Sequence, residues 1–299
     1  MLEKFISISI GALEEGLVYA IMALGVYITY KILDFPDLSV DGTFPMGAAI
    51  TATLITRDLS PLLTLLISFI IGALAGALTG IIHVKCKVRD LLAGIIMMTA
   101  LYSINLRITG GKANIPIFTK KTIFDYDFIN RIPEALQSYT VSIVLFIIVI
   151  IMKLLLDLYL KTKSGYLLRA VGDNDTVVTS LAMDKGYVKI IGLAIANGFV
   201  ALSGSVYAQK SGYFDIYSGT GTMVMGLASV VIGINLFKRW PAVKATSAVI
   251  VGSVIYKLCV AIAIEFGLKV SDLKLITAAL FLIILVASND KKRRAKNHA

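Results

Sequence analysis

The chain has 299 residues, of which 57% are hydrophobic and 16% are charged, and its mean hydropathy is +0.84. A soluble domain of this length carries about 25% charged residues, so the composition excludes an ordinary water-soluble fold and indicates residence in a lipid bilayer. The net charge of +10 does not indicate a nucleic-acid surface, because the basic residues stand in short runs between apolar stretches, as the positive-inside rule describes.

Apolar segments follow one another along almost the whole chain. A helix that crosses a bilayer needs about 20 such residues, and the sequence predicts helices over 8–29, 44–56, 59–83, 90–108, 139–160, 188–208, 221–235, 242–266 and 272–288. The segments 44–56 and 221–235 are too short to cross as straight helices. The expected fold class is therefore all-α, with nine segments in a single transmembrane domain over 1–299.

The basic loops predict the orientation of the chain. Clusters of Lys and Arg occupy the loops 84–89, 161–187 and 236–241 and the tail 289–299, and such loops remain on the cytoplasmic side. Nine crossings then place the N-terminus outside the cell and the C-terminus in the cytoplasm.

Two short segments resemble each other. Residues 34–50, DFPDLSVDGTFPMGAAI, align with 213–229, YFDIYSGTGTMVMGLAS, at an offset of 179 residues. Seven positions are identical: Phe35/Phe214, Ser39/Ser218, Gly42/Gly221, Thr43/Thr222, Met46/Met225, Gly47/Gly226 and Ala49/Ala228. The offset also relates the predicted helices of 8–108 to those of 188–288, on either side of a central helix at 139–160. Because the two halves enter the membrane from opposite sides, we predict an inverted repeat; the alternative is a chance match between Gly- and Ala-rich segments.

Inverted halves with matching interrupted segments are typical of transporters, in which those segments line the substrate path. A helix broken at Gly42 and Pro45 exposes backbone groups that only protein or a water-filled cavity can accommodate. The residues predicted to line the path are Ser39, Asp41, Gly42, Thr43, Pro45, Met46, Ser218, Gly221, Thr222 and Met225. Asp34 and Asp37 either belong to this path, where carboxylates are costly and functional, or lie in an acidic cytoplasmic loop before the next helix.

Two further features of the first half carry alternatives. Gly72, Gly76 and Gly80 recur at a spacing of four, which lets helices approach closely in lipid; we favour packing within the chain over a contact between subunits. Asn105 and Arg107 stand at the outer end of their helix, where they contact an incoming solute or anchor in the headgroups.

Residue types needed for catalysis or metal binding are scarce. The two cysteines and two histidines, Cys86, Cys259, His83 and His298, lack the spacing of a zinc site or a disulfide framework. No GxxxxGK[ST] phosphate loop occurs, so any ATP chemistry must come from another chain. We therefore expect no catalytic residue, no metal and no cofactor on this chain.

The longest basic loop, 161–187, contains the amphipathic stretch SGYLLRAVGDN over 164–174. It resembles the T-x-x-G-x-x-x-R-A-V-G-x-N segment of ABC importer permeases of the branched-chain amino acid and ribose group, through Gly165, Arg169, Ala170, Val171, Gly172 and Asn174. Val178 and Thr179 depart from the pattern, since the family usually has alanines there. The DLSV run over 37–40 and the region 226–233 resemble further family segments. The stretch LDFPDLSVDGTFPMGAA most resembles the family branch associated with tryptophan or tyrosine import.

The resemblance implies a permease subunit of an ATP-driven importer in the bacterial plasma membrane. In that family the 161–187 loop carries the helix that docks on the ATP-binding cassette subunit, which holds ATP and Mg. Here it would comprise Ser164, Gly165, Leu168, Arg169, Ala170, Val171, Gly172, Asp173 and Asn174. The implied partners are that subunit, an extracellular substrate-binding (lipo)protein and a second copy of this chain. The implied cargo is a small polar solute, an amino acid and preferably an aromatic one.

Two other classes of function were compared with this interpretation. A secondary transporter would work alone and couple transport to an ion through the Asp cluster. An intramembrane enzyme would need a nucleophile paired with a base, and the sequence offers no plausible constellation.

Overall fold

The computed structural model describes residues 2–125, 139–173, 184–240 and 242–265, together with scattered positions between 272 and 286. In chain order the elements are α1 (Leu2–Val26), the π-helix η1 (Tyr27–Ile32), α2 (Val40–Thr56), α3 (Pro61–Val84), α4 (Asp90–Ile108), β1 (Asn114–Pro116), α6 (Thr140–Tyr159), α7 (Lys163–Asp173), α9 (Lys185–Ser211), β2 (Tyr213–Asp215), the 3-10 helix η3 (Ile216–Gly219), α10 (Thr222–Leu236) and α11 (Ala245–Glu265).

The described part of the chain is mostly helical and contains seven segments long and apolar enough to cross a membrane. They cover 8–32, 61–84, 90–108, 140–159, 185–211, 216–236 and 245–265, and each overlaps a predicted span. α2 corresponds to the predicted segment 44–56 and, at 17 residues, is shorter than these spans. The predicted span 272–288 lies largely outside the described residues. The polytopic all-α class is therefore confirmed, whereas the number nine is not.

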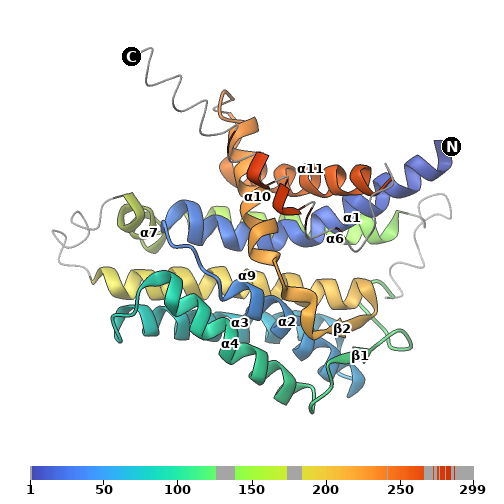
Figure 1. The fold of residues 1–299 in the computed structure, drawn as a ribbon, viewed down its shortest axis with the longest axis horizontal. Coiled ribbons are helices and arrows are strands. Elements are labelled where there is room, and N and C mark those ends of the chain that lie inside the picture. The colour runs from blue at the N-terminus through green and yellow to red at the C-terminus, as the bar shows by residue number, and fades with distance from the viewer. Residues whose placement is uncertain are drawn as a thin grey trace.

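The long helices α1, α3, α9 and α11 run side by side, and α10 crosses them at a steep angle (Figure 1). α7 lies at one end of this bundle, and β1 pairs antiparallel with β2 toward the other (Figure 1). α1 runs toward the α7 end and α9 runs away from it. α3 packs along α9, and α11 packs along α1.

The core is centred on α1 and α9. Residues 17–28, from α1 and the start of η1, are buried on every side, as expected for a helix that is apolar all round. Two ion pairs join α1 to its neighbours: Lys210 of α9 with Glu14 at 3.4 Å, and Lys257 of α11 with Glu15 at 3.0 Å.

Small residues set the distance between the helices. The glycine ladder of α3 faces α9. A side chain at Gly72 would meet Ala201 and Asn197, one at Gly76 would meet Leu193, and one at Gly80 would meet Ile190. In lipid, such close backbone approach replaces the hydrophobic driving force that water supplies elsewhere. The ladder is thus confirmed as a packing contact within the chain.

The first predicted helix break is wrong in position. α2 continues from Val40 through Gly42 and Pro45 to Thr56, and the non-helical stretch is 33–39 instead. Pro45 lies close to the start of α2, where its missing amide removes a single helical hydrogen bond. In the second half the interruption lies where it was predicted: Gly221 has φ +85° and precedes the first residue of α10.

Candidate functional site

The two short segments meet through Asp41. Its carboxylate accepts hydrogen bonds from the Gly221 amide at 2.9 Å, the Thr222 hydroxyl at 3.0 Å and the Met223 amide at 2.7 Å. These donors belong to the first turn of α10, whose amides have no partner within the helix. A carboxylate is favourable there because the N-terminus of a helix carries partial positive charge. Asp41 of α2 therefore caps α10 across 180 residues of sequence.

A cleft of about 420 Å³ opens beside this cap. Its lining comes from α2, α4 and the segment around η3: Asp41, Gly42, Pro45, Met98, Thr99, Tyr102, Ser103, Asn105, Ile216, Tyr217 and Thr220. The lining combines two tyrosine rings and several hydroxyl groups with an apolar floor. Within the described residues, no basic side chain lines it. An apolar surface with a few convergent polar groups is typical of a site for a small molecule.

The structure brings only part of the predicted path to this cleft. Asp41, Gly42 and Pro45 line it. Ser39, Thr43, Met46 and Thr222 are instead buried in packed protein, and Ser218, Gly221 and Met225 are half-buried and do not line it. Their role in transport remains a prediction.

Asn105 lies between the cleft and α2. Its side-chain amide donates to the carbonyl oxygen of Gly42 at 3.1 Å, while its own Oδ1 is buried and has no partner. Asn105 lines the cleft and is fully buried, whereas Arg107 is exposed, so contact with a solute and anchoring in the headgroups both remain predictions.

The predicted Asp cluster is divided by the fold. Asp37 is fully buried and accepts from the Ser39 amide at 2.9 Å and the Asn197 side-chain amide at 2.7 Å. The Ser39 hydroxyl in turn donates to Asn197 Oδ1 at 3.2 Å, so the three side chains close a network between the 33–39 stretch and α9. Asp34 is exposed and has φ +52°. Only Asp41 reaches the cleft.

The sequence did not point to Thr99, Tyr102, Ser103, Tyr217 or Thr220. The first three are exposed on one face of α4, whereas the first half of this helix exposes leucine and isoleucine. Three hydroxyl side chains among five consecutive residues inside a predicted membrane span could have indicated that this part of the helix does not face lipid.

A second candidate surface is α7. Its Gly165, Leu168 and Val171 are buried, and Gly172 packs against the carbonyl oxygen of Ile32 at the end of η1. The Ser164 hydroxyl and the Tyr159 hydroxyl lie 2.9 Å apart, joining α7 to α6. The opposite face is exposed and presents Tyr166, Arg169 and Asp173, with Ala170 half-buried; Asn174 lies outside the described residues. A short helix held firmly on one side and free on the other is suited to receive a partner.

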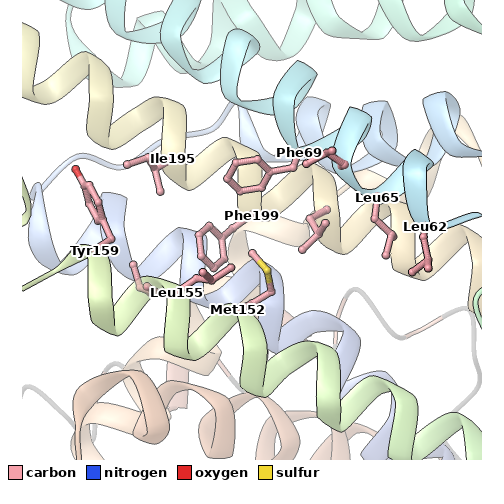
Figure 2. A pocket seen from close by; sticks show the side chains of 11 residues that line it. Leu62, Leu65, Phe69, Met152, Leu155, Tyr159, Ile195 and Phe199 are labelled. Carbon is pink, nitrogen blue, oxygen red and sulfur yellow. The ribbon is translucent and has the colours of Figure 1, made fainter.

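A larger cavity of about 500 Å³ lies between α3, α6 and α9. Figure 2 shows Leu62 and Leu65 near one end, Phe69, Phe199 and Met152 along its length, and Tyr159 at the other end. Its walls are almost wholly apolar, so it suits hydrocarbon and not a polar solute.

Comparison with known proteins shows the family of the chain. The model of the family described as branched-chain amino acid transport system / permease component matches residues 9–287. A tyrosine transport system permease protein of Clostridioides difficile (strain R20291) is 47% identical over 280 residues, which cover 94% of this chain and 91% of the relative. An uncharacterised protein of Rickettsia prowazekii is 32% identical over 286 residues, covering 93% of this chain and 97% of the relative. A ribose import permease protein of Escherichia coli (strain K12) is 23% identical over 222 residues, covering 74% and 67%. No solved structure matches.

Proposed function

The chain belongs to the branched-chain amino acid transport system permease family, which makes it a membrane transport subunit and not an enzyme, and on this premise we propose that it carries an aromatic amino acid, tyrosine, into the cell. The observation that supports this cargo most directly is the 47% identity, over nearly the full length of both chains, to a permease of a tyrosine transport system.

The cleft beside α4 supports the same cargo. Tyr102 and Tyr217 interact across it, and Thr99 and Ser103 add hydroxyl groups. Aromatic rings favour offset or edge contacts with one another, and hydroxyl groups can both donate and accept hydrogen bonds. A solute with a phenol ring and charged backbone groups finds both kinds of contact there.

The energy for uptake would come from a separate ATP-binding cassette subunit that docks on α7. The exposed face of α7, with Tyr166, Arg169 and Asp173, supports this contact. The buried face rests on η1 and on α9. A displacement of α7 would therefore reach α1 and α9, the two central helices.

The inverted repeat is part of the proposal, and pairs of contacts support it. A side chain on Gly47 would meet Ala201, and one on Gly226 would meet Val26 and Met22. The offset of 179 residues that relates the two short segments also relates these contacts: it takes Gly47 to Gly226 and, in the reverse direction, Ala201 to Met22. Likewise α3 packs on α9 while its counterpart α11 packs on α1. The path would run between the two halves, past the cap of Asp41.

The remaining partners and the orientation follow from the same hypothesis. Two copies of the chain, each with its ATP-binding subunit, would form the importer in the bacterial plasma membrane, and an external binding protein would deliver the solute. The end with β1 and β2 would face outward and the end with α7 would face the cytoplasm. The basic loop 84–89 lies at the α7 end, since Val84 contacts Gly186 at the start of α9.

A stand-alone carrier coupled to an ion is the competing function. It would need a carboxylate free to bind and release that ion. The three donors on Asp41 and the closed network around Asp37 argue against this role.

Uptake into vesicles tests the proposal. The chain is reconstituted with or without its ATP-binding subunit, ATP is enclosed on the α7 side, and labelled tyrosine is supplied with the binding protein outside. We expect uptake that needs ATP and both partners and that unlabelled tyrosine suppresses better than leucine or ribose. Uptake by the chain alone, driven by an ion gradient, would overturn the ATP-driven mechanism. ATP-dependent uptake suppressed equally by leucine would overturn only the cargo.

A further inference from the structure

A second polar cleft, of about 340 Å³, lies at the base of α7. Its walls come from the ends of α6 and η1, from α7 and from the start of α11, and they comprise Tyr27, Asp157, Leu160, Lys161, Tyr166, Arg169, Lys244, Ala245 and Thr246. The solute path proposed above does not pass through this cleft, which lies at the opposite end of the molecule from β1 and β2. Two of its lining residues, Tyr166 and Arg169, also belong to the face of α7 that is proposed to receive the ATP-binding subunit.

The cleft has an excess of positive charge. Three of its lining residues are basic and one is acidic. The acidic one, Asp157, already accepts from the Thr246 hydroxyl at 2.7 Å, the Lys153 ammonium at 3.0 Å and the Lys244 ammonium at 3.3 Å. Within the described part of the chain, Lys161 and Arg169 have no carboxylate partner. Among the described residues, no carboxylate balances these two cations.

Its depth in the membrane points to the class of anion. α6 has 20 residues, which span about 30 Å and match the thickness of the hydrocarbon core. Leu154 and Leu158 remain exposed on its outer surface, where hydrocarbon would cover them. Lys161 follows directly after the helix, at the level of the lipid phosphates. A fork of guanidinium donors with nearby ammonium groups is well suited to phosphate oxygens.

From this combination we propose that the cleft binds the phosphodiester group of an anionic membrane phospholipid such as phosphatidylglycerol. Lys161 and Arg169 contact the phosphate oxygens, and the acyl chains lie along the exposed leucines of α6. In the orientation proposed above, the lipid belongs to the cytoplasmic leaflet, where basic pockets between membrane helices bind anionic headgroups. Only the choice of leaflet rests on the proposed function.

The single tryptophan of the chain provides a direct reporter. Trp240 is 64% exposed and stands in the same connection between α10 and α11 as Lys244. The full chain in neutral detergent is titrated with phosphatidylglycerol that carries a pyrene-labelled acyl chain, and energy transfer from Trp240 is recorded. Phosphatidylcholine with the same label is the neutral comparison. We expect saturable transfer with phosphatidylglycerol at concentrations where phosphatidylcholine gives little.

Charge-removing variants then locate the site. Lys161→Gln should weaken the apparent affinity for phosphatidylglycerol about fivefold, since a basic side chain at an anionic membrane surface contributes about that much. Lys161→Arg should restore it. Lys238→Gln removes the same charge from an exposed position of the 236–241 loop outside the cleft, so it should leave the affinity unchanged.

Three results would overturn the assignment. Equal losses in Lys161→Gln and Lys238→Gln would mean a diffuse surface attraction without a defined site. Competition by inorganic phosphate at the concentration of the lipid would mean that a soluble anion is the ligand. Loss of the lipid preference when the ATP-binding subunit assembles on the chain would mean that acidic groups of that subunit occupy the cleft. Because the assay involves no transport, its failure leaves the proposed function untouched, and a failure of uptake leaves the lipid site untouched.

Discussion

Three carboxylates within eight residues have three different environments, and their surroundings decide what each can do. Asp34 is exposed, Asp37 is enclosed by Ser39 and Asn197, and Asp41 caps a distant helix. A carboxylate at membrane depth suggests an ion or substrate site when the sequence alone is read. The hydrogen-bond partners change that interpretation, because a carboxylate with three donors supports structure.

Replacing Asp41 distinguishes a structural from an ion-coupling role. Asp41→Asn keeps one acceptor oxygen for the start of α10, so ATP-driven uptake should largely persist. Asp41→Ala removes the cap and should lower stability by about 1–2 kcal/mol, as the loss of other N-terminal caps does. Thermal unfolding in detergent and vesicle uptake measure the two effects. Complete loss of uptake in a stable Asp41→Asn protein would favour the ion-coupled carrier.

The network around Asp37 should be among the most sensitive points of the fold. Asn197→Ala leaves a fully buried carboxylate with the Ser39 amide as its remaining donor and should cost about 3 kcal/mol of folding stability. Asn105→Ala is the matched control, because that buried amide makes one hydrogen bond, to Gly42, and its loss should cost about 1 kcal/mol. Equal destabilisation of the two variants, measured by unfolding in detergent, would contradict a special role for the network.

At the level of whole elements, regularities within one segment could be predicted and contacts between distant segments could not. Hydropathy located the seven described spans, and the spacing of Gly72, Gly76 and Gly80 marked a helix-packing face. The cap of α10 by Asp41 could not be foreseen, because its partners are about 180 residues away and neither segment has an unusual composition. The helix break expected at Pro45 does not occur: Pro45 is the sixth residue of α2, where it removes one helical hydrogen bond without ending the helix.

The glycine ladder of α3 predicts that the same glycine-to-alanine change lowers the yield of folded protein at one position and not at another. Gly76→Ala would drive a methyl group into the carbonyl oxygen of Leu193 and the side chain of Asn197, so α3 and α9 must separate and the yield of folded protein should fall. Gly11→Ala, in α1, meets no atom within 4 Å and should be neutral or slightly stabilising, because alanine favours a helix more than glycine does. Comparable yields of the two variants in size-exclusion chromatography would show that the ladder tolerates a wider spacing.

A substitution on the exposed face of α7 should impair coupling to ATP hydrolysis without impairing folding. Arg169 is exposed on the free face of α7, so Arg169→Glu should leave the chain inserted and folded while it reverses the charge offered to the ATP-binding subunit. Substrate-stimulated ATP hydrolysis by the purified complex should fall by roughly tenfold or more, as for a reversed charge in an interface. Lys238→Glu, in another basic loop, is the control. Normal stimulation in Arg169→Glu would remove α7 from the coupling contact.

For the molecule as a whole, the two halves stabilise each other by exchanging partners. α3 of the first half packs on α9 of the second, and α11 of the second packs on α1 of the first. Neither half therefore buries its own first helix, and the pair Lys257–Glu15 also crosses from one half to the other. With the proposed inverted repeat, this arrangement would explain why the sequence identities are confined to the short segments. Lipid-facing positions can change freely, whereas the crossing points require small residues such as Gly47 and Gly226.

The opposite direction of α1 and α9 makes the orientation testable with the native cysteines. Cys86 is exposed in the 84–89 loop at the α7 end, and Lys112 is exposed just before β1 at the other end. In a Cys259→Ser background, a membrane-impermeant maleimide should reach Cys86 only after the cells are permeabilised. With Cys86 also changed to Ser, Lys112→Cys should be labelled in intact cells. Because both sites lie outside the spans, accessibility depends on which side of the membrane each occupies. The reverse pattern would place α7 outside the cell, where no ATP-binding subunit could reach it, and would refute the orientation and the importer mechanism together.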